Sequence, residues 1–214
     1  MNLLNHYYYF EKALPDRFCE DLKKHAKNKQ EQIAVTGLIG QERDIKKNPL
    51  NKKELKLLKK KRDSKIVWMD DRWIYEEIIP FVKEANKKAG WNFNFDWAET
   101  SQFTKYGKNQ YYDWHCDSFE LPYNQPNNIN LHGKIRKLSV TCSLSDPKDY
   151  KGGELEFNFN NPEKTKKQNI RKCLEILPKG SIVVFPSFVW HRVCPVIKGT
   201  RHSLVIWNLG YPFK

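Results

Sequence analysis

The chain has 214 residues, with 38 Lys and Arg against 25 Asp and Glu, which gives a formal net charge of +13. This length is typical of one domain, and 39% hydrophobic with 14% aromatic residues favours a packed globule over a disordered chain. No apolar run approaches the length of a membrane span, which excludes a membrane-spanning helix. We therefore do not expect a membrane partner. We therefore predict a single domain over residues 1–214.

The first residues and the cysteines indicate the compartment. The N-terminal stretch lacks the basic flank and the long apolar core of a signal peptide. The five cysteines are scattered, odd in number and without a CxxC pair, which favours reduced thiols over a disulfide framework. We expect a soluble, cytoplasmic protein.

The N-terminal part predicts a strand followed by a helix. Residues 3–10 are typical of a short strand. Asp16 is a plausible helix N-cap, and Leu22 and His25 then fall on one helix face. Residues 33–39 fit a strand or a loop.

Lysine dominates the next segment. Residues 41–65 are polar, although their leucines could line a marginal helix, and we predict an insertion or a lid that is partly disordered. Much of the excess positive charge lies in residues 46–65 and 164–172. Solvated faces or mobile loops explain such runs, and attraction to an acidic partner or a nucleic-acid backbone is the alternative.

A stronger helix is predicted over residues 72–89. Two aspartates precede it as caps, apolar residues recur at helical spacing, and Gly90 ends it. Pro80 lies inside this helix, which predicts a kink or a break just before it.

The rest of the chain alternates short apolar runs with turn residues. Strands are expected at residues 93–97, 100–106, 136–144, 154–157, 174–177, 181–185, 190–193 and 203–209. A polar loop at 118–134 is a candidate substrate lid, and residues 158–172 are expected to form a charged hairpin tip. This pattern fits an α+β, mainly β fold: a double-stranded β-helix (jelly roll) over residues 99–210, supported by helices within residues 1–98.

His115, Asp117 and His191 form the strongest candidate site. Residues two apart on an extended strand face the same side, so His115 and Asp117 can bind one ion together. His191 begins a later predicted strand and is the best candidate for a third ligand. Two imidazoles and one carboxylate leave three positions open on an octahedral ion, which points to non-haem Fe(II) oxygenase chemistry.

Arg201 and Ser203 are candidates for binding a cosubstrate. An oxygenase of this type needs a dicarboxylate held at its far end, and a guanidinium matches a carboxylate in a bidentate manner. Ser203, two residues on, faces the same side and can donate a second hydrogen bond. The alternative is an arginine on an exposed strand face, but the apolar run at 204–207 favours a strand that enters a core.

A longer pattern surrounds the first two metal-ligand candidates. Tyr106, Tyr112, His115 and Asp117 match Tyr-x-x-Gly-x-x-Tyr-x-x-His-x-Asp, with Asn109 in place of the Gly. Asn is the commonest non-Gly residue to tolerate a positive φ angle, so this departure is mild. On these residues the chain resembles the 2-oxoglutarate and Fe(II)-dependent oxygenases of the prolyl 4-hydroxylase type, in particular the small bacterial and phage PKHD-type hydroxylases.

The resemblance covers roughly residues 99–210. Residues 138–155 are similar to the family's central hairpin, and residues 178–201 to its C-terminal part. One departure is Ser143, where relatives often carry Tyr or Phe, and it puts in question any hydrogen bond that such an aromatic residue makes to the cosubstrate.

The resemblance implies a set of roles for these residues. His115, Asp117 and His191 would bind Fe(II), with 2-oxoglutarate and O2 as cosubstrates and ascorbate as a further expected cofactor. Arg201, assisted by Ser203, would anchor the far carboxylate of 2-oxoglutarate.

Three aromatic residues are also implicated by the resemblance. Tyr106 would reach the cosubstrate or the pocket near the metal, with a structural tyrosine at a turn as the alternative. Trp207 and Tyr112 are assigned to a candidate substrate pocket, although Trp207 could equally be a core residue and Tyr112 could pack beneath the site.

The implied reaction hydroxylates a C–H bond while 2-oxoglutarate is converted to succinate and CO2. The leading hypothesis for the substrate is a peptidyl-proline, which makes a peptide or protein the expected partner. The alternatives are a nucleic acid, suggested by the charge of +13, or a small molecule, and a non-enzymatic jelly-roll module with a vestigial metal site. Alkylated-base demethylases of this superfamily carry a second arginine in this region, whereas here Arg201 and Ser203 are followed by apolar residues.

Overall fold

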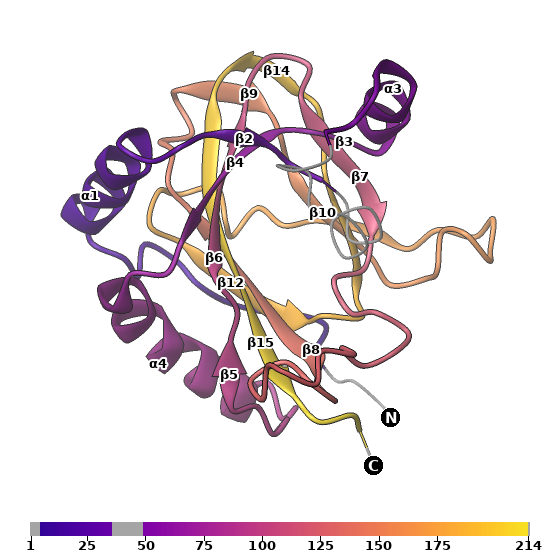
Figure 1. Cartoon of the computed structure of the whole chain (residues 1–214). Coiled ribbons are helices and arrows are strands. Elements are labelled where there is room, and N and C mark those ends of the chain that lie inside the picture. The colour runs from indigo at the N-terminus through magenta and orange to yellow at the C-terminus, as the bar shows by residue number, and fades with distance from the viewer. Residues whose placement is uncertain (1–4, 36–48, 214) are drawn as a thin grey trace.

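The computed structural model describes residues 5–35 and 49–213. These residues form two main β-sheets that face each other, with helices outside them (Figure 1). The helices are α1 (Asp16–Lys27), α3 (Lys52–Lys61) and α4 (Arg72–Lys88).

The large sheet is antiparallel throughout. Its strands follow the order β1 (Tyr8–Phe10), β12 (Ile182–Pro186), β8 (Ile135–Ser143), β15 (Arg201–Gly210), β6 (Ser101–Tyr106), β4 (Lys65–Met69) and β2 (Gln32–Ile33), with β5 (Trp97–Ala98) paired to β15. Strands distant in sequence lie next to each other, as in β12, β8 and β15, which is the connectivity of a jelly roll.

The facing sheet is smaller, and a short ribbon accompanies it. The small sheet has the order β11 (Ile170–Lys172), β10 (Leu155–Asn158), β13 (Trp190–Val193), β7 (Tyr111–His115) and β3 (Arg62–Asp63), and the ribbon pairs β14 (Val196–Gly199) with β9 (Tyr150–Gly152). The observed architecture confirms the predicted mainly β jelly roll with helices on one face.

Helices α1 and α4 cover the outer face of the large sheet (Figure 1). Leu22 of α1 and Ile78 of α4 are fully buried in one cluster with Val140 of β8 and Leu204 of β15. Removing one such side chain from water contributes about 1.5–3 kcal/mol. This packing fixes the large sheet as a rigid floor for whatever lies on its other face.

The inner face of the large sheet is polar at one end and apolar at the other. Successive residues of a strand point to opposite faces, so Ser139 and Thr141 of β8 and Ser203 of β15 face inward while their neighbours face the helices. At the other end, Phe157 of β10 and Phe185 of β12 fill the space between the sheets. The polar end is where a hydrophilic ligand fits.

Two predicted strands are wrong. Residues 93–97 are irregular except for β5, because the side chain of Asn86 on α4 binds both the backbone N–H and the carbonyl of Phe93. Residues 174–177 form a turn, in which the Leu177 N–H donates to the Leu174 carbonyl. In both places local hydrogen bonds replace the ladder that a strand requires.

The prediction for the lysine-rich segment is partly wrong. The marginal helix exists as α3, and the residues that follow it form β3 and the start of β4 rather than a disordered insertion. Asn51 caps α3 by accepting hydrogen bonds from the backbone of Lys53 and Glu54. Residues 36–48 lie outside the described residues, and with them the first part, 41–48, of the predicted insertion or lid.

The two remaining helices start or continue differently from the prediction. Pro15 occupies the N-cap position of α1, and Asp16 lies in the first turn instead. Helix α4 continues through Pro80 without a break, because the buried residues on either side, Ile78 and Val82, hold it against the sheet. The carboxylate of Asp71 at its N-terminus makes no cap and binds Lys29 of the α1–β2 connection at 2.8 Å.

Candidate metal centre

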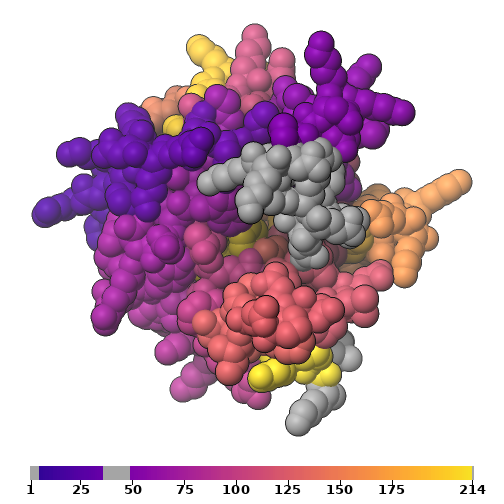
Figure 2. Space-filling model, in the orientation of Figure 1, coloured from indigo at the N-terminus to yellow at the C-terminus, as the bar shows by residue number. Residues whose placement is uncertain are grey.

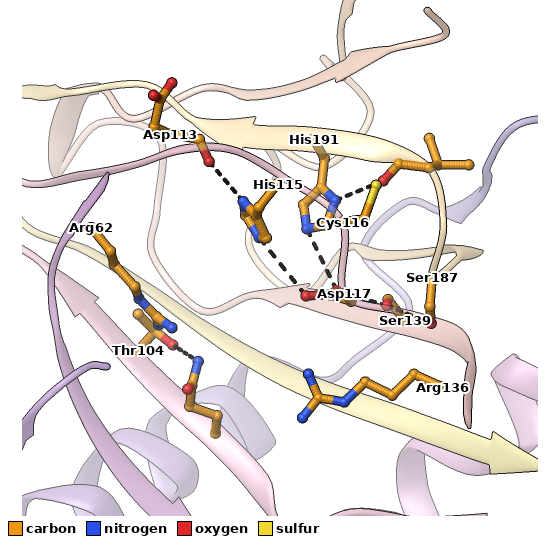
Figure 3. Close-up of polar contacts among 12 residues, drawn as sticks. Arg62, Thr104, Asp113, His115, Cys116, Asp117, Arg136, Ser139, Ser187 and His191 are labelled. Atoms are coloured by element: carbon orange, nitrogen blue, oxygen red, sulfur yellow. Dashed lines mark hydrogen bonds and ion pairs between the residues drawn. The ribbon is translucent and has the colours of Figure 1, made fainter. Parts of the chain in front are cut away.

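The two candidate histidines are brought together by strand pairing. His115 is the last residue of β7, and it lies directly opposite His191 of β13 in the small sheet. Their ring centroids are 4.1 Å apart. Asp117 follows β7, and its backbone N–H donates to the carbonyl of Ser187. The three side chains therefore converge on one point, with potential ligand atoms all within 4.8 Å of one another (Figure 3).

Both imidazoles are held in the orientation that a metal requires. Nδ1 of His115 lies 2.7 Å from the carbonyl oxygen of Asp113, and Nδ1 of His191 lies 3.0 Å from that of Val189. A carbonyl oxygen accepts but never donates, so each Nδ1 carries the proton and each Nε2 keeps a free lone pair. The two Nε2 atoms lie 3.8 and 3.5 Å from the carboxylate oxygens of Asp117.

The carboxylate of Asp117 is buried but stays ionised. Burial by itself raises the pKa of this carboxyl group, but the two imidazoles and the guanidinium of Arg136 outweigh it and the net pKa is lowered. Ser139 contributes by donating a hydrogen bond from Oγ to Oδ2 at 2.7 Å. Asp117 is thus a candidate anionic ligand, and a serine on the polar inner face of the large sheet holds its carboxylate in place.

Burial and the neighbouring His191 lower the pKa of His115 well below its ordinary value of 6.5. His115 is therefore neutral at physiological pH, as a metal ligand must be. A neutral imidazole pair with one carboxylate, all reaching in from one side, fits a divalent ion such as Fe(II) and leaves its other positions open.

Arg201 is the first residue of β15 and shares the polar inner face of the large sheet with Ser203. It is 3% exposed, and its Nη1 donates to Ser203 Oγ at 3.2 Å. Its guanidinium carbon lies 5.6 Å from the ring centroid of Tyr106, the residue opposite it on β6. Among the described residues no carboxylate forms an ion pair with Arg201. A buried guanidinium without a counter-charge is the arrangement expected of an anchor for a ligand carboxylate.

Comparison with known proteins identifies the family. Residues 101–208, half of the chain, match the family model of the 2OG-Fe(II) oxygenase superfamily. The chain belongs to this superfamily. The resemblance that the Tyr106–Asp117 pattern indicated is thereby confirmed.

Several PKHD-type hydroxylases are similar in sequence to part of this chain. YbiX of Escherichia coli O157:H7 is 35% identical over 109 residues, which are 50% of this chain and 41% of that protein. A PKHD-type hydroxylase of Synechococcus sp. (strain CC9902) is 38% identical over 100 residues, 47% of this chain and 36% of its own length. The matched stretch thus spans less than half the length of these curated relatives.

Solved structures of this superfamily share the fold over nearly the whole chain. The viral collagen prolyl hydroxylase of Paramecium Bursaria Chlorella virus-1, in its 2OG complex, gives a TM-score of 0.60 at 19% identity and covers 97% of both chains. A prolyl hydroxylase from Trichoplax adhaerens, in complex with a hypoxia inducible factor peptide fragment, gives 0.59 at 15% identity, covering 96% of this chain and 84% of that one. At these identities the likeness concerns the fold alone.

In this member of the superfamily, the aromatic residues singled out from the sequence lie in two places. The Tyr112 ring stacks on His115 with centroids 3.5 Å apart, so it touches a ligand candidate directly. Trp207 is 5% exposed on the inner face of β15, and its indole N–H has no hydrogen-bond partner among the residues that the structure describes. Ser143, the departure from the family pattern, lies beside Ser203 in the pairing of β8 with β15.

Three residues of the site were missed by the sequence reasoning. Ser139 could have been found, because it alternates with the apolar residues of β8. Arg136 could not, since its buried pairing with Glu99 depends on the distant β5–β6 connection. Arg62 was hidden in the lysine-rich segment, yet it reaches the Tyr112 ring at 4.5 Å. Figure 3 shows Arg62 and Arg136 on two sides of the triad.

Within the described ranges, no helix has the length and apolar character needed to cross a membrane.

Proposed function

We propose that this protein is a 2-oxoglutarate- and O2-dependent hydroxylase that holds Fe(II) through His115, Asp117 and His191. The observation that carries the proposal is the convergence of two free imidazole Nε2 atoms and one ionised carboxylate within 4.8 Å. Arg201 adds a buried guanidinium that pairs with no carboxylate of the described residues. Iron bound there supplies oxidation of a C–H bond, coupled to conversion of 2-oxoglutarate to succinate and CO2, with ascorbate as a supporting reductant.

Arg201 and Ser203 bind the far carboxylate of 2-oxoglutarate in this proposal. The guanidinium fork matches a carboxylate in a bidentate manner, and the neighbouring hydroxyl adds one donor. Tyr106 packs against Arg201 from the paired strand and orients it. The hydroxyl groups of the inner sheet face take the place of water around the ligand.

The substrate that we propose is a peptidyl-proline in a peptide or protein. Its support is the shared fold with prolyl hydroxylases, one of which is in complex with a peptide fragment, and the PKHD-type hydroxylases among the relatives. We assign Tyr112 and Trp207 to the pocket for the pyrrolidine ring. Tyr112 stacks on His115, and Trp207 lies opposite Ser139, whose hydroxyl binds Asp117.

The proposal is tested by succinate formation from 2-oxoglutarate under air with Fe(II) and ascorbate. A pool of proline-containing peptides is compared with pools of single- and double-stranded DNA and RNA. We expect stimulation by the peptides, whereas stimulation by nucleic acid alone would replace the substrate class and make the charge of +13 functional.

His191→Ala is the matched variant for this assay. It removes one ligand while leaving β13 paired on both sides, so we expect succinate formation to fall to the background without loss of the folded state. Circular dichroism provides the folding control. Turnover by His191→Ala at the wild-type rate would remove the proposed triad.

A further inference from the structure

Arg62 is a buried arginine in a segment that is otherwise rich in exposed lysine. It begins β3, the edge strand of the small sheet, where it pairs with Tyr112 of β7. Its side chain is turned inward and only 5% exposed, whereas Lys60, two residues earlier, is exposed. The guanidinium carbon lies 4.5 Å from the centroid of the Tyr112 ring, which itself stacks on His115.

Among the described residues, the charge of Arg62 has no counter-charge. Nε donates to Ser64 Oγ at 2.9 Å, and within the described part of the chain no carboxylate pairs with the guanidinium. Arg201 shares this property, whereas two other arginines near the site are paired. Arg136 is paired with Glu99, and Arg192 with Glu156. An arginine that is buried without a partner destabilises the fold unless a ligand compensates it.

Arg62 and the proposed cosubstrate anchor belong to different sheets. Arg201 lies on β15 in the middle of the large sheet, whereas Arg62 comes from the edge strand of the opposite sheet. The guanidinium of Arg62 contacts Tyr112, the ring that the proposed function assigns to the substrate pocket. This contact places Arg62 at the substrate part of the proposed site.

The chemistry of the unsatisfied groups defines what that molecule offers. A guanidinium has five N–H donors and no acceptor, and the indole N–H of Trp207 is another buried donor without a partner. A peptide segment at proline complements such a surface. The imide nitrogen of proline carries no hydrogen, so the segment presents carbonyl oxygens there without a competing N–H.

We propose that Arg62 is a specificity-determining residue that binds a main-chain carbonyl oxygen of the substrate beside the proline to be hydroxylated. This inference rests on the proposed function, since it assumes a peptide substrate. It also assigns the end of the lysine-rich segment, α3 with β3, to the substrate side of the site. Ser64 is a positioning residue, because its hydroxyl accepts the hydrogen bond from Nε and leaves the two Nη groups to bind the ligand.

The first test measures the thermal stability of Arg62→Gln and Arg62→Lys without ligands. A residue kept for the fold lowers the melting temperature when it is replaced. A residue kept for a ligand leaves the melting temperature unchanged or higher when its uncompensated charge is removed. We expect the second result for Arg62→Gln. Lys60→Gln removes the same charge from an exposed position of the same segment and controls for electrostatics alone.

The second test measures 2-oxoglutarate binding to the Mn(II)-loaded protein by calorimetry. We expect the dissociation constant of Arg62→Gln to stay within twofold of the wild type, whereas Arg201→Lys weakens binding at least tenfold. An equal loss in both variants would place Arg62 in the cosubstrate site and overturn the inference.

The third test measures peptide binding in the same Mn(II)- and 2-oxoglutarate-loaded state, in which no turnover occurs. Wild-type protein selects from a displayed library of peptides that each contain one proline, and the affinity of the best peptide is compared between variants. We expect at least a tenfold loss for Arg62→Gln, a smaller loss for Arg62→Lys and for Ser64→Ala, and none for Lys60→Gln.

The outcomes separate this inference from the function on which it rests. Equal binding of one peptide by wild type and Arg62→Gln overturns the role of Arg62 and leaves the peptide substrate intact. Loss of stability and of both ligands together in Arg62→Gln makes the residue structural and also overturns it. Failure of the wild type to select any peptide removes the peptide substrate, and the role of Arg62 with it.

Discussion

At the scale of single residues, the site depends on side chains that are not themselves ligands. The Nδ1 atoms of His115 and His191 are fixed by backbone carbonyls, and Asp117 is fixed by Ser139. Such contacts set the tautomer and the direction of each ligand, and their loss typically weakens metal binding by 10–100-fold. The geometry of the triad is therefore built into β7, β8 and β13 before any ion arrives.

Gly153 offers a test of the cosubstrate anchor at this scale. A Cβ atom at this position would lie 3.0 Å from Cδ of Arg201 and 2.9 Å from Cγ2 of Val196, and the φ angle of +68° is unfavourable for alanine. We expect Gly153→Ala to displace Arg201 and to raise the dissociation constant of 2-oxoglutarate at least fivefold, as measured by calorimetry on the Mn(II)-loaded protein.

Gly90 provides the matched control for Gly153. Its φ angle of +73° is similar, but a Cβ atom there would meet nothing within 4 Å. Gly90→Ala should therefore cost about 1 kcal/mol of stability through backbone strain alone and leave 2-oxoglutarate binding unchanged. Equal effects of the two substitutions on binding would mean that Gly153 does not act through Arg201.

The sequence allowed some of these residues to be predicted and not others. His115 and Asp117 share a strand face through the period of two, and His191 could be found because turn residues delimit its strand. Arg62 carries no such signal, since one more cation in a lysine-rich run is typical of a solvated face. Its burial depends on the pairing of β3 with β7, a contact between residues about 50 positions apart that local pattern does not encode.

At the scale of elements, the connection from α3 to β3 determines where Arg62 lies. A capping box holds the start of α3: Asn51 accepts from the backbone of Lys53 and Glu54, and the Glu54 carboxylate accepts from the backbone of Asn51. Near its other end, Leu58 is the residue of α3 that is fully buried. A ten-residue helix with so little buried surface depends on its cap.

Asn51→Ala is predicted to loosen α3 locally. Loss of the cap should cost about 1 kcal/mol, and hydrogen exchange at the amides of residues 52–61 should accelerate while that of α4 stays unchanged. Lys56→Ala, at an exposed position of the same helix, is the control and should have no such effect. Unchanged exchange in Asn51→Ala would show that contacts other than the cap hold α3.

The strands that were predicted correctly are those whose apolar residues and flanking turn residues can be read from the neighbouring sequence. The strands expected at residues 136–144, 181–185 and 203–209 correspond to β8, β12 and β15, because apolar residues are frequent in these short runs and turns delimit them. The strand expected at 93–97 is absent because one side chain of α4 satisfies its backbone, which is a tertiary effect. Helix α4 continues through Pro80 because of tertiary packing too, since its buried residues hold it against the sheet.

At the scale of the whole molecule, buried histidines link stability to pH. Burial, with the nearby charges of Lys23 and Lys105, lowers the pKa of His202 to about 4. The unfolded chain, with an ordinary value of 6.5, takes up this proton first as the pH falls. The resulting stability is therefore complete above pH 6.5 and is lost progressively as the pH falls toward 4.

We expect the melting temperature of the metal-free protein to fall between pH 6.5 and 4, and to fall less steeply in His202→Gln. One pKa unit corresponds to about 1.36 kcal/mol, which sets an upper limit of about 3.4 kcal/mol for the contribution of His202. The protonation of His115 acts in the same direction. His132→Gln, at an exposed position, is the control, and an equally flattened profile in that variant would contradict the role of His202.

The most direct measurement for the whole account is an anaerobic calorimetric titration, first with Fe(II) and then with 2-oxoglutarate. We predict one Fe(II) per wild-type chain and one 2-oxoglutarate per iron-loaded chain. We expect no specific Fe(II) site in His191→Ala, and Fe(II) binding with weakened 2-oxoglutarate binding in Arg201→Lys. Fe(II) binding by His191→Ala with wild-type affinity, or 2-oxoglutarate binding that is indifferent to Arg201, would contradict the proposed site.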